Sequence, residues 1–150
     1  MPAGGGSASP VLGDSKPVRR FFAPCFLPDG LRLMYGALWL NGSNAYVEVP
    51  SVASLNPGVG NVSIDAWVKI DALADVNDVR VLVEKRADNP WRGYSFFLYN
   101  GRLGVQLADG TASNFISTIV VPADKAWHLV AVTVERANVQ SVRFYRWASR

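Results

Sequence analysis

The sequence predicts an all-β protein, an antiparallel β-sandwich preceded by a disordered N-terminal leader. Three observations carry this prediction. Apolar and polar residues alternate with a period of two from residue 35 onward, turn dipeptides interrupt the alternation, and no segment has an apolar stripe at helical spacing. Short strands separated by such turns are typical of sandwiches and barrels. A chain of 150 residues is long enough for about one domain.

Residues 62–70 give the clearest strand. Five apolar residues occupy every second position of this segment, namely Val62, Ile64, Ala66, Val68 and Ile70. Successive side chains of a strand point to opposite faces, so this spacing places one face on a core. Trp67 lies on the opposite face, where we expect it to have a structural role.

Further strands are expected at short intervals along the chain. They cover residues 45–49, 79–85, 94–99, 102–107, 115–121, 127–134 and 142–145. Asn100-Gly101 is a strong hairpin signal because both central positions of such a turn need a positive φ. Asp109-Gly110 predicts a second turn of the same kind.

The first 34 residues are expected to form a flexible leader rich in glycine and proline. Ten of the 22 glycine and proline residues lie within the first 30 positions, and residues 1–28 have no regular period. Proline removes a backbone donor, so a regular element is not expected there. Arg19-Arg20 resembles part of an export signal, but Pro24 and Pro28 interrupt the apolar stretch that should follow. The segment therefore gives no convincing signal peptide.

Composition and charge exclude several classes of protein. The net charge is +3, but residues 39–135 alone sum to −3 and the basic excess belongs to the two ends. This distribution argues against a nucleic-acid partner. No apolar run is long enough to span a membrane. The single cysteine, Cys25, and the single histidine, His128, exclude an internal disulfide framework and a His- or Cys-built metal site.

Several phrases of the chain resemble a known family. The clearest are 40–50 (LNGSNAYVEVP), 62–69 (VSIDAWVK), 127–133 (WHLVAVT) and 142–145 (VRFY), with weaker matches at 84–85, 93–96 and 100–103. In this order they resemble successive strands of LamG-like jelly-roll domains, laminin G-like or pentraxin-like members of the concanavalin A-like lectin/glucanase superfamily. The resemblance covers residues 36–145 or so. It implies a jelly roll acting as a non-catalytic recognition or adhesion module, within a larger extracellular or cell-surface protein.

The family usually continues beyond the phrase at 142–145 into further strands, whereas this sequence ends at Arg150. We therefore expect an incomplete sandwich, with a partial LamG-like domain at residues 35–147 and a tail at 148–150. Two other interpretations of the chain stay open. In the first, the chain is a structural spacer or a non-functional gene fragment. In the second, it is a glycoside hydrolase like the glucanases of the superfamily.

The carboxylates argue against the hydrolase. A retaining glycosidase needs two carboxylates about 5–5.5 Å apart, a geometry that alternate positions of one strand supply. The three glutamates, Glu48, Glu84 and Glu135, have no acidic residue two positions away. His128 lies within a predicted strand beside Trp127, and the family phrase implies a structural or surface role for it.

Carbohydrate binding has a better candidate. Sugar sites combine an aromatic ring with amide, carboxylate and guanidinium groups. The segment from Asp88 to Arg92 contains all of these, so Asp88, Asn89, Trp91 and Arg92 are the predicted ligand-binding residues. The alternative is that Trp91 covers one end of the core. The expected partner is a glycan or a cell-surface or matrix protein.

Calcium is compatible with the sequence, because oxygen-bearing side chains are common in the predicted turns. The candidates are Asn44, Asp75, Asn77, Asp78, Asp88 and Asp109. Their spacing is not diagnostic, since Asn and Asp are frequent in turns for conformational reasons. The metal ligands therefore stay unknown at this stage.

Overall fold

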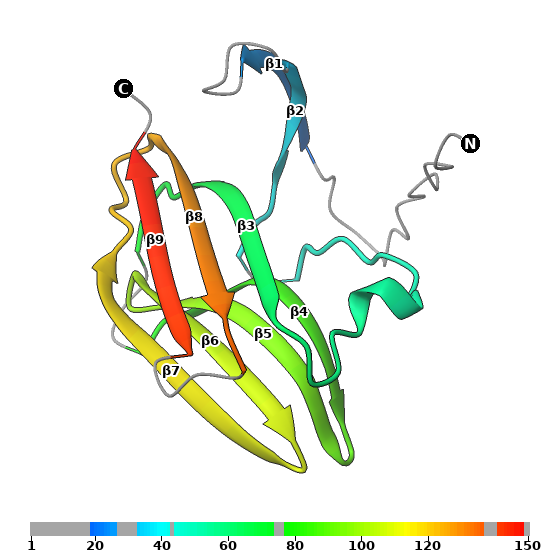
Figure 1. The fold of residues 1–150 in the computed structure, drawn as a ribbon. Coiled ribbons are helices and arrows are strands. Elements are labelled where there is room, and N and C mark those ends of the chain that lie inside the picture. The colour runs from blue at the N-terminus through cyan, green and yellow to red at the C-terminus, as the bar shows by residue number, and fades with distance from the viewer. Residues whose placement is uncertain (1–18, 27–32, 43, 74–76, 137–140, 149–150) are drawn as a thin grey trace. The chain divides into compact units, whose positions relative to one another are not determined.

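The structure is a computed structural model that describes residues 19–26, 33–42, 44–73, 77–136 and 141–148 (Figure 1). The chain divides into two compact units, residues 1–51 and residues 52–150. Within the described ranges the secondary structure is nine strands and one short 3-10 helix, η1 (Ala53–Leu55). This confirms the all-β prediction. No helix in the described part of the chain has the length and apolar character that crossing a membrane requires.

The second unit is a sandwich of two antiparallel sheets. The strands are β3 (Val62–Lys69), β4 (Val79–Asp88), β5 (Trp91–Tyr99), β6 (Arg102–Asp109), β7 (Thr111–Val120), β8 (Trp127–Val134) and β9 (Val142–Ala148). One sheet has the order β3-β8-β9 and the other has the order β4-β5-β6-β7. Figure 1 shows the two sheets as facing layers, which confirms the predicted sandwich.

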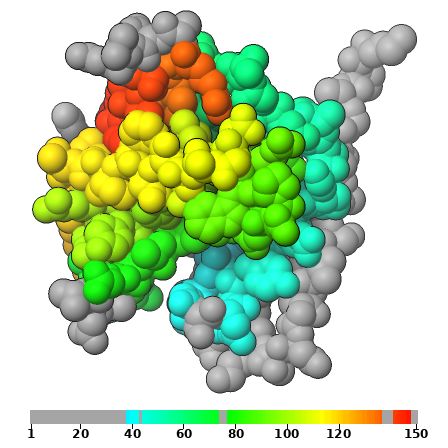
Figure 2. Space-filling model, turned by 90° about the horizontal axis from the view of Figure 1, so that it is seen from below, coloured from blue at the N-terminus to red at the C-terminus, as the bar shows by residue number. Residues whose placement is uncertain are grey.

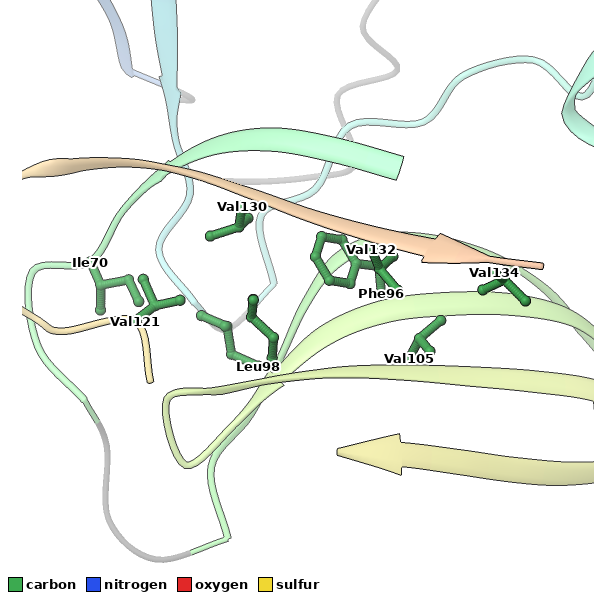
Figure 3. Packing of buried hydrophobic residues seen from close by; sticks show 9 residues of the cluster. Ile70, Phe96, Leu98, Val105, Val121, Val130, Val132 and Val134 are labelled. Carbon is green, nitrogen blue, oxygen red and sulfur yellow. The ribbon is translucent and has the colours of Figure 1, made fainter. Parts of the chain in front are cut away.

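The core lies between these layers. In β8 the burial alternates strictly, so that Val130, Val132 and Val134 point inward. Phe96 and Leu98 of β5 point toward them from the other sheet (Figure 3). The remaining core residues are Ile70, Leu103, Val105 and Val121. Each such side chain contributes about 1.5–3 kcal/mol when fully buried, so this interface stabilises the fold.

The predicted strands from residue 62 onward are present, but hairpin pairing extends several of them. β4 continues to Asp88 and β5 begins at Trp91 rather than Tyr94. β7 begins at Thr111 rather than Phe115. Most of the added residues are exposed, and none is buried, because a backbone ladder continues beyond the segment that faces the core. The predicted loop at Asp88 is therefore a tight turn between two paired strands.

The strand predicted at residues 45–49 is wrong. These residues have no regular secondary structure, and Tyr46 and Val49 are more than half exposed. The side-chain oxygen of Asn41 accepts hydrogen bonds from the backbone N–H groups of Asn44 and Ala45. Alternation alone does not make a strand, because a strand needs a neighbour with which to pair.

The first unit contains an antiparallel hairpin, β1 (Arg19–Phe26) with β2 (Leu33–Trp39). The structure thus differs from the expected leader, in which no regular element was predicted around Pro24. The register shifts between Phe21 and Pro24, and an irregularity of this kind accommodates a residue that cannot donate to the ladder. The rest of the predicted leader, at 1–18 and 27–32, and the tail at 149–150 lie outside the described residues.

The two predicted hairpin turns differ in geometry. Asn100 and Gly101 have φ values of 49° and 76°, which confirms the turn expected between β5 and β6. At the next turn Gly110 has a φ of 81°, whereas Asp109 belongs to the ladder and pairs with Thr111. The second turn is therefore present but has a different geometry from the first.

Candidate functional site

The predicted binding residues surround the turn between β4 and β5. Asp88 ends β4 and pairs with Trp91, the first residue of β5, so only Asn89 and Pro90 connect the two strands. The peptide bond between these two connecting residues is cis. This pairing places the side chains of Asp88 and Trp91 on the same face of the sheet. Phe96 points to the core five positions later, so that face is the outer one.

Trp91 is exposed at this turn. Its exposed fraction is 45%, and it is not part of the core cluster. The guanidinium of Arg86 lies 5.8 Å from the centroid of the indole ring. This distance is within the range of a cation–π contact, which holds one face of the ring against Arg86. A ligand would therefore stack on the opposite face of the ring.

Arg86 is a residue that the sequence prediction missed. It donates a hydrogen bond of 2.6 Å to the side-chain oxygen of Gln106, and it lies 3.6 Å from carboxylate oxygens of both Glu84 and Asp88. Gln106 donates in turn to Asn114, at 2.8 Å. This row connects β4, β6 and β7. Its sequence signal is the period of two that places Glu84, Arg86 and Asp88 on one face, but the cross-strand partners depend on the register.

A second turn adjoins the first. The backbone N–H of Gly110 donates to the carbonyl oxygen of Trp91 at 2.7 Å, and Arg92 lies 3.4 Å from the carboxylate of Asp109. Figure 2 views the molecule from this end, where the green surface of the β4–β5 turn meets the yellow surface of the β6–β7 turn. The side chains of Asp88, Arg92 and Asp109 are 84%, 69% and 89% exposed. The register thus adds Asp109 to the predicted residues.

The charges at this end of the sheet balance. Glu84, Asp88 and Asp109 supply three negative charges, and Lys85, Arg86 and Arg92 supply three positive charges. Each arginine already has a carboxylate neighbour. The site consequently offers hydroxyl-binding groups of both kinds, without a surplus of cations that would attract a polyanion.

His128 lies away from this turn and is buried. Only 2% of its side chain is exposed, and its Nε2 is 3.0 Å from a carboxylate oxygen of Asp124. An ionised carboxylate only accepts, so Nε2–H donates. Hydrogen bonds from His128 and from the backbone N–H of Ala126 hold the pKa of Asp124 below its ordinary value of 3.8. No group in the described part of the chain bonds Nδ1 of His128. The contact ties the β7–β8 connection to β8.

A family model supports the architecture. The model described as the concanavalin A-like lectin/glucanases superfamily, of the laminin G type, matches residues 41–146, which is more than half of the chain. The chain belongs to this superfamily. At the family level it is therefore a lectin-like binding module, and the resemblance seen in the sequence is confirmed. The chain matches no curated protein and no solved structure.

Superfamily membership alone leaves open whether the module is catalytic, because the superfamily includes both lectins and glucanases. The relevant carboxylates are those of Glu84 and Asp88, on one face of β4. The guanidinium of Arg86 lies within 3.6 Å of an oxygen of each. Arg86 therefore contacts both acidic side chains of this strand.

The calcium candidates are distributed over several turns. Asn77 accepts a hydrogen bond from the hydroxyl of Tyr99, and the carboxylate of Asp78 is 2.6 Å from Arg80. Asn44 is bonded by Asn41 in the first unit, and Asp75 lies outside the described residues. Across the ranges that the structure describes, no three His, Cys, Asp or Glu side chains are grouped as metal ligands. Calcium binding stays a prediction without assigned ligands.

Proposed function

We propose that this lectin-like module is a non-catalytic carbohydrate-binding domain whose site is the β4–β5 turn. The observation that carries the proposal is an exposed indole held at a hairpin tip. Trp91 is 45% exposed, and Arg86 packs against one face of its ring. An exposed aromatic ring of fixed orientation provides a stacking surface for the C–H face of a sugar.

Polar groups at the same end of the sheet match the hydroxyls of a sugar. Asp88, on the face of the indole, offers carboxylate oxygens that accept hydrogen bonds, and Arg92 and Asp109 offer donors and acceptors on the opposite face. These side chains are largely exposed, so binding a ligand does not require the core to change. The site lies on two turns anchored to a rigid sheet, a common arrangement for binding residues. These features support an uncharged glycan as the ligand.

The absence of catalysis is part of the proposal. Arg86 separates Glu84 from Asp88, so these two carboxylates cannot approach one glycosidic bond from opposite sides. We also infer a location at the cell surface or outside the cell, where structural glycans are accessible. Cleavage of the module by a protease added to intact cells checks this location, and complete protection would contradict it.

A glycan array followed by isothermal titration calorimetry tests the site. The chain is screened with calcium and with a chelator, and the best glycan is then titrated into variants. Trp91→Ala is expected to weaken binding by about tenfold, corresponding to about 1.4 kcal/mol of lost stacking. Trp147→Ala is the matched control, because Trp147 is also an exposed tryptophan, on β9 of the other sheet. It should bind as the unmodified chain does.

Two outcomes would contradict the proposal. One is the absence of any glycan binding by a chain whose circular dichroism shows a folded β-protein. The other is an equal loss of affinity in Trp91→Ala and Trp147→Ala. Release of sugar from chromogenic glycosides or from the bound glycan would contradict the non-catalytic part alone. A requirement for calcium would show a metal site and would leave the role of Trp91 intact.

A further inference from the structure

The guanidinium of Arg86 has a neighbour at each of its three nitrogens. Nη1 donates the hydrogen bond of 2.6 Å to the side-chain oxygen of Gln106, Nη2 lies 3.6 Å from Glu84, and Nε lies 3.6 Å from Asp88. The central carbon of the same group lies over the ring of Trp91, 5.8 Å from its centroid. A planar cation held at its nitrogens presents a fixed face, so the position of the indole depends on what holds the arginine.

The contact with Gln106 is the strongest of the three. Its length of 2.6 Å is that of a short hydrogen bond, and the charge on the donor strengthens it. Both carboxylate contacts, at 3.6 Å, are too long for a hydrogen bond. The side chains of Glu84 and Asp88 are 38% and 84% exposed, and ion pairs in contact with water contribute little. Gln106 is therefore the residue that holds the guanidinium in place.

The arginine reaches Gln106 by crossing a strand. Arg86 belongs to β4 and Gln106 to β6, and β5 lies between them in the sheet. The residues of β5 that pair with them are small, because Arg86 pairs with Gly93 and Gln106 pairs with Ser95. Ser95 is only 3% exposed although it lies on the outer face, so neighbouring side chains cover it. The small residues thus leave room for the long side chain of Arg86 to lie across β5.

Asn114 fixes the orientation of the Gln106 amide. The amide nitrogen of Gln106 donates to the side-chain oxygen of Asn114 at 2.8 Å, and the two residues pair across β6 and β7. With its nitrogen turned toward β7, the amide presents its oxygen to the guanidinium of Arg86, which can only donate. The reverse orientation would place two donor groups against each other. The row from Asn114 through Gln106 and Arg86 therefore crosses the sheet and ends at the indole of Trp91.

We propose that Gln106 is a positioning residue for the sugar site. It holds Arg86 against the indole and so fixes the orientation of Trp91 before a ligand arrives. Trp91 is 45% exposed and is not part of the core cluster, so packing against the core does not order its ring. A side chain that is already ordered loses less conformational freedom when a ligand binds. The inference rests on the proposed function for its effect on binding, whereas the order of the indole can be measured without any glycan.

A direct contact between Gln106 and the ligand is the competing explanation. Both ends of the amide are already bonded within the sheet, Oε1 to Arg86 and Nε2 to Asn114. A direct contact would compete with one of these two hydrogen bonds. The two explanations also differ in what happens when Arg86 is removed. A positioning effect of Gln106 then disappears, whereas a direct contact with the ligand would remain.

Nuclear magnetic resonance of the complete, isotope-labelled chain without ligand tests the inference. The signal is the indole N–H of Trp91, assigned by its absence in Trp91→Phe, and its order parameter reports the fast motion of the ring. Gln106→Ala should lower this order parameter to below about 0.6, while the indole signals of Trp67 and Trp127 keep theirs. Gln106→Glu should restore it, because a carboxylate still accepts from the guanidinium. Arg102→Ala is the matched control, an exposed residue on the same face of β6, and should leave it unchanged.

The affinity for the glycan selected on the array is the second readout. Calorimetry should show a dissociation constant about three- to tenfold higher for Gln106→Ala, because an exposed side chain must then be ordered on binding. Gln106→Glu should recover most of the affinity. In the Arg86→Ala background, Gln106→Ala should change neither the order of the indole nor the affinity, because Gln106 acts through the arginine.

Circular dichroism and thermal melting identify a variant that has failed to fold. Asn114→Ala is then the second variant, because it frees the Gln106 amide to turn, and it should lower the order of the indole to a smaller extent. The inference is overturned by an unchanged indole in Gln106→Ala, by an equal loss of order at all indoles, or by additive effects of Gln106→Ala and Arg86→Ala. Lost order with unchanged affinity would also overturn it. A chain that binds no glycan, yet loses the order of Trp91 in Gln106→Ala, would contradict the proposed function and support the positioning role.

Discussion

The two turns at the ends of β5 differ in what surrounds them. At the Asn100–Gly101 turn the contacts are mostly backbone hydrogen bonds. Asn100 donates to the carbonyl oxygen of Asp78, and Val121 donates to that of Gly101. At the Asp88–Trp91 turn one backbone bond is accompanied by exposed charged groups and an exposed indole. Both turns connect neighbouring strands of the same sheet, so the residues rather than the fold distinguish a structural end from a recognition end.

Burial explains why the two turns differ. The Asn100–Gly101 turn, here called the structural end, is buried at Gly101, whereas the Asp88–Trp91 turn, the recognition end, is exposed. Gly101 is buried, and an added Cβ would lie 3.3 Å from the side chain of Leu73. Leu103, two residues later, has an exposed fraction of 0%. Side chains at the structural end are held in place by packing against the core. Side chains at the recognition end are held in place by ion pairs, hydrogen bonds and a cation–π contact with each other. Substitutions at the two ends should therefore separate stability from binding.

The largest expected effect is on stability, from Leu103→Ala. Removing a fully buried leucine side chain should lower the free energy of unfolding by about 2–5 kcal/mol, because apolar burial is lost and a cavity remains. Trp91→Ala, at the recognition end, should lower it by less than about 1 kcal/mol, since the indole is 45% exposed. Urea unfolding followed by circular dichroism measures both.

A large loss of stability in Trp91→Ala would contradict this comparison. It would show that the indole packs as a cover over the core, which was the alternative role considered for it. The m-value of each variant is a control, because it should stay constant if the native and unfolded states keep their surface areas.

The sequence predicts the structural end better than the recognition end. Asn100-Gly101 is identified by its residues alone, because few other pairs accept a positive φ at both positions. The strand that begins at Trp127 is identified by its period of two, because every second side chain is buried in the core. Arg86 shares a face of β4 with Asp88 through the period of two, but its contact with Gln106 and the approach of Asp109 to Arg92 depend on the register of three strands. Local sequence does not encode that register. β1 was not predicted because its proline argues against a regular element.

A smaller effect on stability is expected at two glycines, one at each end. Gly101 and Gly110 have similar φ values, 76° and 81°. Gly101→Ala should lower the free energy of unfolding by about 1–2 kcal/mol, since strain at positive φ is combined with crowding against Leu73. Gly110→Ala should cost about 1 kcal/mol from strain alone, because an added Cβ there would have no neighbour within 4 Å. Thermal melting of the two variants compares them, and a more damaging change at Gly110 would contradict the assignment of the ends.

Lowering the pH should destabilise the fold through protonation of Asp124. Its pKa is lowered in the folded protein, chiefly by the hydrogen bond from His128, so the ionised carboxylate stabilises the fold. The stabilisation is complete above the ordinary pKa of 3.8 and is lost as the pH falls through 3.8 and then through the lower folded value. In the Asp124→Asn variant, the free energy of unfolding should therefore decrease less as the pH falls through this range. Urea titrations at several pH values measure the slope, and Glu135→Gln is a control carboxylate that pairs with an exposed arginine.

The smallest expected effect on stability is at the recognition end, from the pair of Arg92 and Asp109. Both side chains are mostly exposed, and their charged atoms are 3.4 Å apart. Exposed ion pairs contribute about 0–1 kcal/mol, so a double-mutant cycle with Arg92→Ala and Asp109→Ala should give a coupling near zero in urea unfolding. The same variants should each weaken glycan binding several-fold, because they remove a donor and an acceptor at the end of the sheet that carries Trp91. A strong coupling in stability without any effect on binding would make the pair a structural clamp between the two turns. Near-zero coupling in stability together with weaker binding would instead place the function of this end in its exposed side chains.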